Sequence, residues 1–326
     1  MLSYDALAMI MLCSKLGLDP DPDPKPLTLR EWNPLAKKIA NSPIKTPGAM
    51  LGLSVSELQK ALKVDQLQAE ELWVLMDRSG VIAIELERLN SIGIKVITRA
   101  DKDYPERYLK RLKESAPAIL FYSGENALLD QRGIAVVGSR NLNHVGERAA
   151  ELIGNACGLS GLVLYSGGAK GVDTLSMDAS LTSRGTAVGV IANNLERIIR
   201  TPLYRNAIQH GDLCLVTPYL PSAPFSVGNA MGRNRLIYTL ADYAIVVSSS
   251  ANSGGTWAGA TQNLKNNWVP LFVLEYEDMP EGNALLMENG AIRLPQSVTE
   301  DHKQFIEYLE NMSGKGNIKP EQLGLF

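Results

Sequence analysis

The chain has 326 residues, of which 45% are hydrophobic and 21% charged, a balance that indicates a folded protein of about two domains and excludes a mainly disordered one. No stretch approaches the roughly 20 uninterrupted apolar residues that a membrane span needs, and no basic stretch followed by a long apolar run opens the sequence. We therefore expect a cytoplasmic protein without a membrane segment. Its three cysteines and three histidines are scattered, which predicts neither a disulfide framework nor a zinc site.

The net charge of −3 conceals an asymmetry along the chain. Residues 131–235 contain ten basic and six acidic residues, whereas residues 236–326 contain five basic and eleven acidic ones. The first of these parts is therefore basic on balance and the second acidic. Such a distribution is compatible with a phosphate-binding patch in the first part.

Apolar residues recur at helical spacing in three stretches of the N-terminal region: Ala6–Leu16, Trp32–Ile39 and Val55–Leu89. Ser54 is followed three residues later by Glu57, a spacing typical of a helix N-terminus. We expect residues 1–90 to form a small helical domain.

The next two segments differ from this pattern. Residues 91–130 contain short strand candidates at Gly93–Thr98 and Ala118–Ser123, and we expect them to form a linking segment. From residue 133 short apolar runs alternate with helical stretches. These runs are Ile134–Val137, Leu162–Tyr165, Ala187–Ile191, Leu213–Thr217, Tyr243–Val247 and Val269–Val273.

A run such as Tyr243–Val247 is apolar throughout, as a strand covered on both faces must be. Strands that alternate with helices predict an α/β fold with a Rossmann-like parallel sheet and helices on both faces. We assign this domain to residues 131–300 and a C-terminal tail to residues 301–326. In such sheets ligands bind beyond the carboxyl ends of the strands, so the turns that follow the strands are the candidate site.

Two of these turns are rich in glycine, which lets the backbone approach a phosphate closely, and each also carries a cation. The candidate residues are Gly138, Ser139 and Arg140 after the first run, and Ser166, Gly167, Gly168 and Lys170 after the second. We expect Asp173, which follows them, to begin a helix or to orient Lys170. A polar turn after the fifth run adds Ser253 and Gly254.

The helix before the fifth run contributes Arg233, Asn234 and Arg235. Residues two apart do not share a helix face, so we expect only one of the two arginines to contact the ligand, with a slight preference for Arg235. The other arginine then supports the fold.

Motifs for catalysis are missing from the sequence. The glycine spacing matches neither the dinucleotide fingerprint nor a P-loop, and no nucleophile is spaced from a base as in known hydrolases. We expect a protein that is not an enzyme and that needs no cofactor or metal.

These turns, in this order, resemble the DNA-processing protein A family (DprA, also called Smf). The matching pieces are Ser91–Thr98, Asp103–Pro105, Pro117–Gly124, Val136–Arg140, Tyr165–Asp173, Gly232–Ile237, Ser253–Thr256 and Gly290-Ala291. The resemblance implies an N-terminal helical domain, a dimer, and binding of single-stranded DNA that is handed to a RecA-type recombinase in transformation or repair. It places the DNA pocket at Arg140, at Ser166–Lys170 and at Arg233–Arg235.

The sequence departs from the family pattern at Met177, where a histidine is usual, and at Pro218, where an acid is usual. An alternative is a nucleotide-binding sensor or nucleotide-cleaving enzyme of a related Rossmann-like family, acting in defence against foreign DNA. The glutamate that cleavage would need four positions after Thr256 is replaced by Ala260. A third alternative is a scaffold that acts through its helical domain alone.

Overall fold

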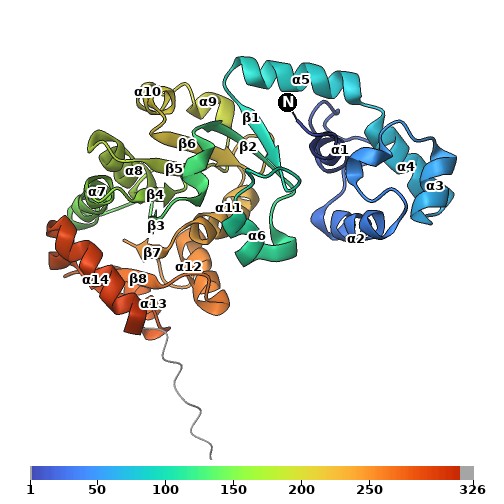
Figure 1. Ribbon diagram of the computed structural model, residues 1–326. Coiled ribbons are helices and arrows are strands. Elements are labelled where there is room, and N and C mark those ends of the chain that lie inside the picture. The colour runs from blue at the N-terminus through green and yellow to red at the C-terminus, as the bar shows by residue number, and fades with distance from the viewer. Residues whose placement is uncertain (1, 316–326) are drawn as a thin grey trace, which may run out of the picture.

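The computed structural model describes residues 2–315, which form a group of N-terminal helices followed by a nine-stranded sheet with helices on both faces (Figure 1). The N-terminal helices are α1 (Tyr4–Cys13), α2 (Leu29–Asn41), α3 (Val55–Leu62), α4 (Gln66–Met76) and α5 (Ser79–Ser91). Helix α5 leads from this group to the sheet.

The predicted helix start at Ser54 is confirmed. The Ser54 amide donates to the Glu57 carboxylate at 2.8 Å, and the Glu57 amide donates back to the Ser54 hydroxyl at 3.4 Å. The stretch Val55–Leu89, which has helical spacing in the sequence, forms three helices because the chain turns twice within it. Lys63 ends α3 in the left-handed conformation, and Asp65 caps α4 by accepting from the Gln68 amide.

The predicted Rossmann-like sheet is confirmed, with a mixed rather than wholly parallel set of strands. The strands are β1 (Lys95–Thr98), β2 (Ile119–Gly124), β3 (Gly133–Val137), β4 (Val163–Ser166), β5 (Ala187–Val190), β6 (Leu213–Thr217), β7 (Tyr243–Val246), β8 (Leu271–Glu275) and β9 (Ile292–Pro295). Their order is β1-β2-β6-β5-β4-β3-β7-β8-β9, and β3 to β9 run parallel.

This order determines where a ligand pocket opens. From β3 the chain builds outward through β4, β5 and β6, then returns to the other side of β3 to add β7, β8 and β9. The loops that leave β3 and β7 therefore diverge, and a crevice forms between them at the carboxyl ends of these strands.

Residues 91–130, expected to be a linking segment, instead extend the sheet. Strand β1 pairs antiparallel with β2, and β2 pairs antiparallel with β6. Helix α6 (Glu106–Leu112) lies between these strands in sequence and packs against α11 (Val227–Leu240). The segment is thus part of the α/β unit and braces one of its helices.

Side chains of the strands alternate between two cores. Ile134 and Val136 pack under α7 (His144–Leu159) and α8 (Val172–Thr182), whereas Ala135 and Val137 pack under α11 and α12 (Gly254–Asn266) on the other face. The shorter helices are α9 (Leu195–Ile198), α10 (Pro202–His210) and α13 (Glu281–Glu288).

The C-terminal tail expected over residues 301–326 contains a packed helix. Helix α14 (His302–Lys315) lies against α7 and buries Phe305 and Leu309. Residues 316–326 lie outside the described residues. No helix within residues 2–315 is long and apolar enough to cross a bilayer.

Candidate nucleic-acid interface

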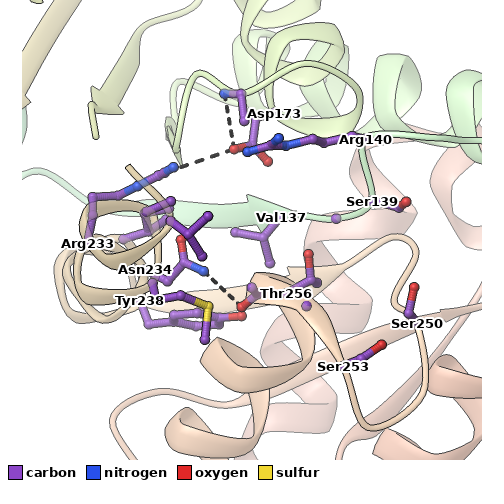
Figure 2. A pocket seen from close by; sticks show the side chains of 18 of the residues that line it. Val137, Ser139, Arg140, Asp173, Arg233, Asn234, Tyr238, Ser250, Ser253 and Thr256 are labelled. Carbon is purple, nitrogen blue, oxygen red and sulfur yellow. Dashed lines mark hydrogen bonds and ion pairs between the residues drawn. The ribbon is translucent and has the colours of Figure 1, made fainter. Parts of the chain in front are cut away.

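Two adjoining hollows open at the carboxyl ends of the parallel strands. The larger, of about 370 Å³, lies between the β3 and β7 loops and α11 (Figure 2). The smaller, of about 300 Å³, lies over the turn from Gly167 to Lys170 after β4. They share Arg140, Ala169, Phe225 and Arg233. We call them the main cavity and the side hollow.

Backbone hydrogen bonds hold the three strand-end loops together around Ser139. The Ser139 amide donates to the Ser248 carbonyl after β7 at 2.9 Å, and the Ser139 carbonyl accepts from the Val172 amide at the start of α8 at 3.3 Å. A Cβ on Gly171 would lie 2.4 Å from this same carbonyl oxygen, and Gly171 has a φ of +94°, so the close approach requires glycine. The sequence's glycine-rich turns thus build the wall of the cavity.

Arg233 forms the floor where the two hollows meet. Its side chain is 6% exposed and lies in a notch that exists because residue 167 has no side chain: a Cβ on Gly167 would lie 1.5 Å from Nη1 of Arg233. Asp173 approaches this nitrogen at 4.0 Å. Within residues 2–315, Nε and Nη1 of Arg233 have no hydrogen-bond partner.

The charges of this buried pair are poorly solvated. Burial raises the pKa of Asp173 above its ordinary value, although Arg233 opposes the shift. Burial likewise lowers the pKa of Arg233, against the attraction of Asp173. A guanidinium with two unpartnered N–H groups in such a place is well suited to an incoming anion.

The rim of the site combines cations with apolar side chains. The guanidinium of Arg140 lies over the ring of Phe225, 5.2 Å from its centroid. Lys170 and Arg140 are exposed. Phe225, Val227 and Met231 are 50%, 71% and 44% exposed, so an apolar strip borders the cationic edge.

The opposite wall is polar. Figure 2 shows Ser250, Ser253 and Thr256 across the cavity from Arg140 and Arg233. Helix α12 begins here, and the Ser253 side chain makes no capping hydrogen bond to it, so its first amides are available to an anion. Asn234 on α11 donates to the Gly255 carbonyl at 2.8 Å and ties the two walls together.

The structure brings together most of the residues selected from the sequence. Those that line the two hollows are Gly138, Ser139, Arg140, Gly167, Gly168, Lys170, Arg233, Asn234, Ser253 and Gly254. Ser166 does not line them, because its hydroxyl is buried and donates to the Val136 carbonyl at 2.6 Å. Arg235 does not line them either, and it donates to the Ser115 carbonyl at 3.2 Å.

The structure bears on two expectations about charged side chains. Arg233 and Arg235 point to different sides of α11, as their spacing predicted, and Arg233 faces the cavity whereas Arg235 does not, which favours Arg233 over Arg235 as the ligand contact. Asp173 lies in the first turn of α8, as one of the two alternatives predicted, and its cationic neighbour is Arg233 rather than Lys170.

Several residues that line the hollows are not among those predicted from the sequence. Phe225, Met231, Tyr238, Asn193 and Thr256 all line one of the hollows. Asn193 and Thr256 follow strands or open a helix, so the strand-end rule could have found them. Nothing local in the sequence marks Tyr238, whose buried hydroxyl has no partner within the described residues.

The fold and the site define a Rossmann-like protein with a cationic pocket at its topological switch point. The family model described as DNA recombination-mediator protein A matches residues 95–307. The chain belongs to this family.

Curated relatives and solved structures of DNA processing protein A are similar to this chain. DNA processing protein DprA of Bacillus subtilis is 32% identical over 168 residues, 50% of this chain and 54% of the relative, so the chain matches about half of that protein's length. DprA of Streptococcus pneumoniae is 29% identical over 219 residues, 62% of this chain and 76% of the relative.

The crystal structure of the Streptococcus pneumoniae protein superposes with a TM-score of 0.70 at 20% identity, over 94% of this chain and 98% of that one. A structure of Helicobacter pylori DNA processing protein A, whose subject is its single-stranded DNA binding mode, superposes with a TM-score of 0.55 at 22% identity. That match covers 68% of this chain and 97% of that one.

Proposed function

We propose that this protein binds single-stranded DNA at the two hollows and delivers it to a RecA-type recombinase. The observation that carries the proposal is the convergence of Arg140, Lys170 and Arg233 at the switch point of the sheet. Cations beside free backbone amides bind phosphates, and the adjoining Phe225 offers a face on which a base stacks.

The descriptions of a related protein and of the matching family support this proposal. The Helicobacter pylori protein binds single-stranded DNA, and the matching family is that of recombination mediators. By the same likeness we propose that the protein acts as a homodimer in the cytoplasm.

We also propose that the protein acts by binding, without turnover. Asp173, the carboxylate that lines the main cavity, is paired with Arg233 and buried, which leaves it poorly placed to serve as a base. Purified protein should therefore not hydrolyse ATP, nucleoside monophosphates or DNA. Turnover that persists on further purification and disappears in Asp173→Ala would contradict this.

A titration tests the proposed function. Fluorescence anisotropy would compare a single-stranded oligonucleotide, a duplex of equal length and a panel of free nucleotides. We expect the single strand to bind more tightly than the duplex and with little dependence on sequence, because phosphate and stacking contacts read few base edges. Preference for the duplex, or tight binding of a free nucleotide with no binding of DNA, would favour another function.

A further inference from the structure

The two hollows together contain more positive charge than one internal DNA phosphate can balance. The charged residues that line the two hollows are Arg140, Lys170, Arg233 and Asp173. Three cations and one carboxylate leave an excess of two positive charges. An internal phosphodiester carries a single negative charge, whereas a phosphate monoester carries about 1.5 to 2 at neutral pH.

The burial of Arg233 also favours a phosphate at the end of a strand over an internal one. Arg233 lies at the floor, with a side chain that is 6% exposed, and its Nε and Nη1 have no partner within residues 2–315. Unpartnered buried N–H groups of a cation are costly, so an anion that reaches them gains more than one that stays at the rim. A phosphate inside a strand carries a nucleoside on both sides, and both must approach a hollow of about 300 Å³ with it. A phosphate at the end of a strand carries only one nucleoside and can enter end-on.

We propose that the side hollow accepts a terminal phosphate monoester of single-stranded DNA, held between Arg140, Lys170 and Arg233, so that the protein prefers phosphorylated strand ends to internal positions. This proposal rests on the proposed function and specifies its ligand. Lys170 and Arg140 attract the phosphate at the rim, and Arg233 binds it at the floor. Binding of the phosphate weakens the ion pair between Asp173 and Arg233.

The experiment uses single strands of one sequence with four kinds of end: a 5′-phosphate, a 3′-phosphate, hydroxyls at both ends, and a closed circle. We expect one phosphorylated form to bind about tenfold more tightly than the hydroxyl form or the circle, a factor that corresponds to ~1.4 kcal/mol. The form that gains identifies which end is recognised. Equal affinity for all four overturns the proposal and leaves single-strand binding intact.

Three variants test whether the side hollow causes the preference for a phosphorylated strand end. Arg233→Met should abolish it. Lys170→Ala, on the exposed rim where folding is not at risk, should reduce it. Arg184→Ala should keep it, because Arg184 is exposed, follows the C-terminal end of α8 and lines neither hollow. A preference that survives in both Arg233→Met and Lys170→Ala overturns the assignment.

A second measurement does not depend on DNA binding. The melting temperature of the full chain would be recorded with dTMP, thymidine and inorganic phosphate. Stabilisation by dTMP but not by thymidine, lost in Arg233→Met, supports a monoester site even if oligonucleotides fail to bind. Equal stabilisation by inorganic phosphate without any effect of strand ends would mean a free-phosphate site and overturn end recognition, as would no stabilisation by dTMP.

Discussion

The two sides of α11 differ in how their polar groups are satisfied. On the side that faces α6, the carbonyls at the end of the helix accept hydrogen bonds from three α6 side chains: Tyr108 to Leu236, Arg107 to Leu240, and Arg111 to Thr239 and Ala241. On the side that faces the cavity, Arg233 and Tyr238 keep unpartnered polar atoms within the described residues. The first side holds the helix in place, and the second is available to a ligand.

Arg233 and Arg235 illustrate this difference because they are the same residue type two positions apart. Arg235 leaves its Nε without a partner but donates from Nη2 to the Ser115 carbonyl. Arg233 has no such acceptor within residues 2–315 and relies on Asp173 at 4.0 Å. Residue type alone therefore does not distinguish a binding cation from a structural one, and its surroundings do.

The strongest test of the cavity side is Gly167→Ala. The new Cβ would lie 1.5 Å from Nη1 of Arg233 and 2.6 Å from Oδ2 of Asp173. Both atoms end side chains, so we expect Arg233 to move out of its notch and Asp173 to shift while the fold persists. We expect affinity for single-stranded DNA to fall about tenfold or more, equal to at least ~1.4 kcal/mol, in an anisotropy titration. In Gly80→Ala, the matched control in α5, the added Cβ meets no atom within 4 Å, and affinity should stay unchanged. Wild-type affinity in Gly167→Ala would show that Arg233 does not bind the ligand.

Substitutions on the α6 side of α11 should lower the stability of the protein rather than its affinity for DNA. Arg111→Met removes hydrogen bonds of 2.9 and 2.6 Å to the Thr239 and Ala241 carbonyls, and bonds from a charged donor contribute about 1.5–3 kcal/mol. We expect a lower melting temperature, and a smaller decrease for Arg235→Met, which removes one bond of 3.2 Å. Affinity for DNA should remain within about twofold of the wild type, below ~0.5 kcal/mol. A large loss of affinity in Arg235→Met at an unchanged melting temperature would reverse the assignment of the two sides.

Asp173 makes the stability of the protein depend on pH, and we expect this effect to be smaller than those of the substitutions above. Since the pKa of Asp173 is raised in the folded protein, the folded state binds the proton more readily than the unfolded state. This contribution to stability is complete below the unfolded pKa and is lost as pH rises through the folded pKa. We expect the melting temperature of the wild type, relative to Asp173→Asn, to decrease as pH rises from about 4. The opposite slope would mean that Arg233 outweighs burial.

The sequence predicted the parts of the site that depend on local chemistry. Glycine at 167 and cations at 140 and 170 follow apolar runs, and parallel strands bring such turns to one edge of the sheet. Two features depended on distant contacts. The direction of Arg233 follows from α6 occupying the other side of α11, and β1, only four residues long, is held by its pairing with β2. The sequence marks β1 as a strand candidate, but neither its pairing with β2 nor the packing of α6 on α11 leaves a local pattern.

The most direct test of phosphate binding at this site is the salt dependence of affinity for single-stranded DNA in Arg140→Ala, Lys170→Ala and Arg184→Ala. Each phosphate that a cation neutralises releases counterions, so the slope of log affinity against log salt should flatten by about 0.7 for each phosphate of a single strand that the variant no longer neutralises. We expect weaker binding and a flatter slope in the first two variants and neither change in Arg184→Ala. Unchanged affinity and slope in Arg140→Ala and Lys170→Ala, with the fold intact by circular dichroism, would contradict the account and place the DNA elsewhere on the protein.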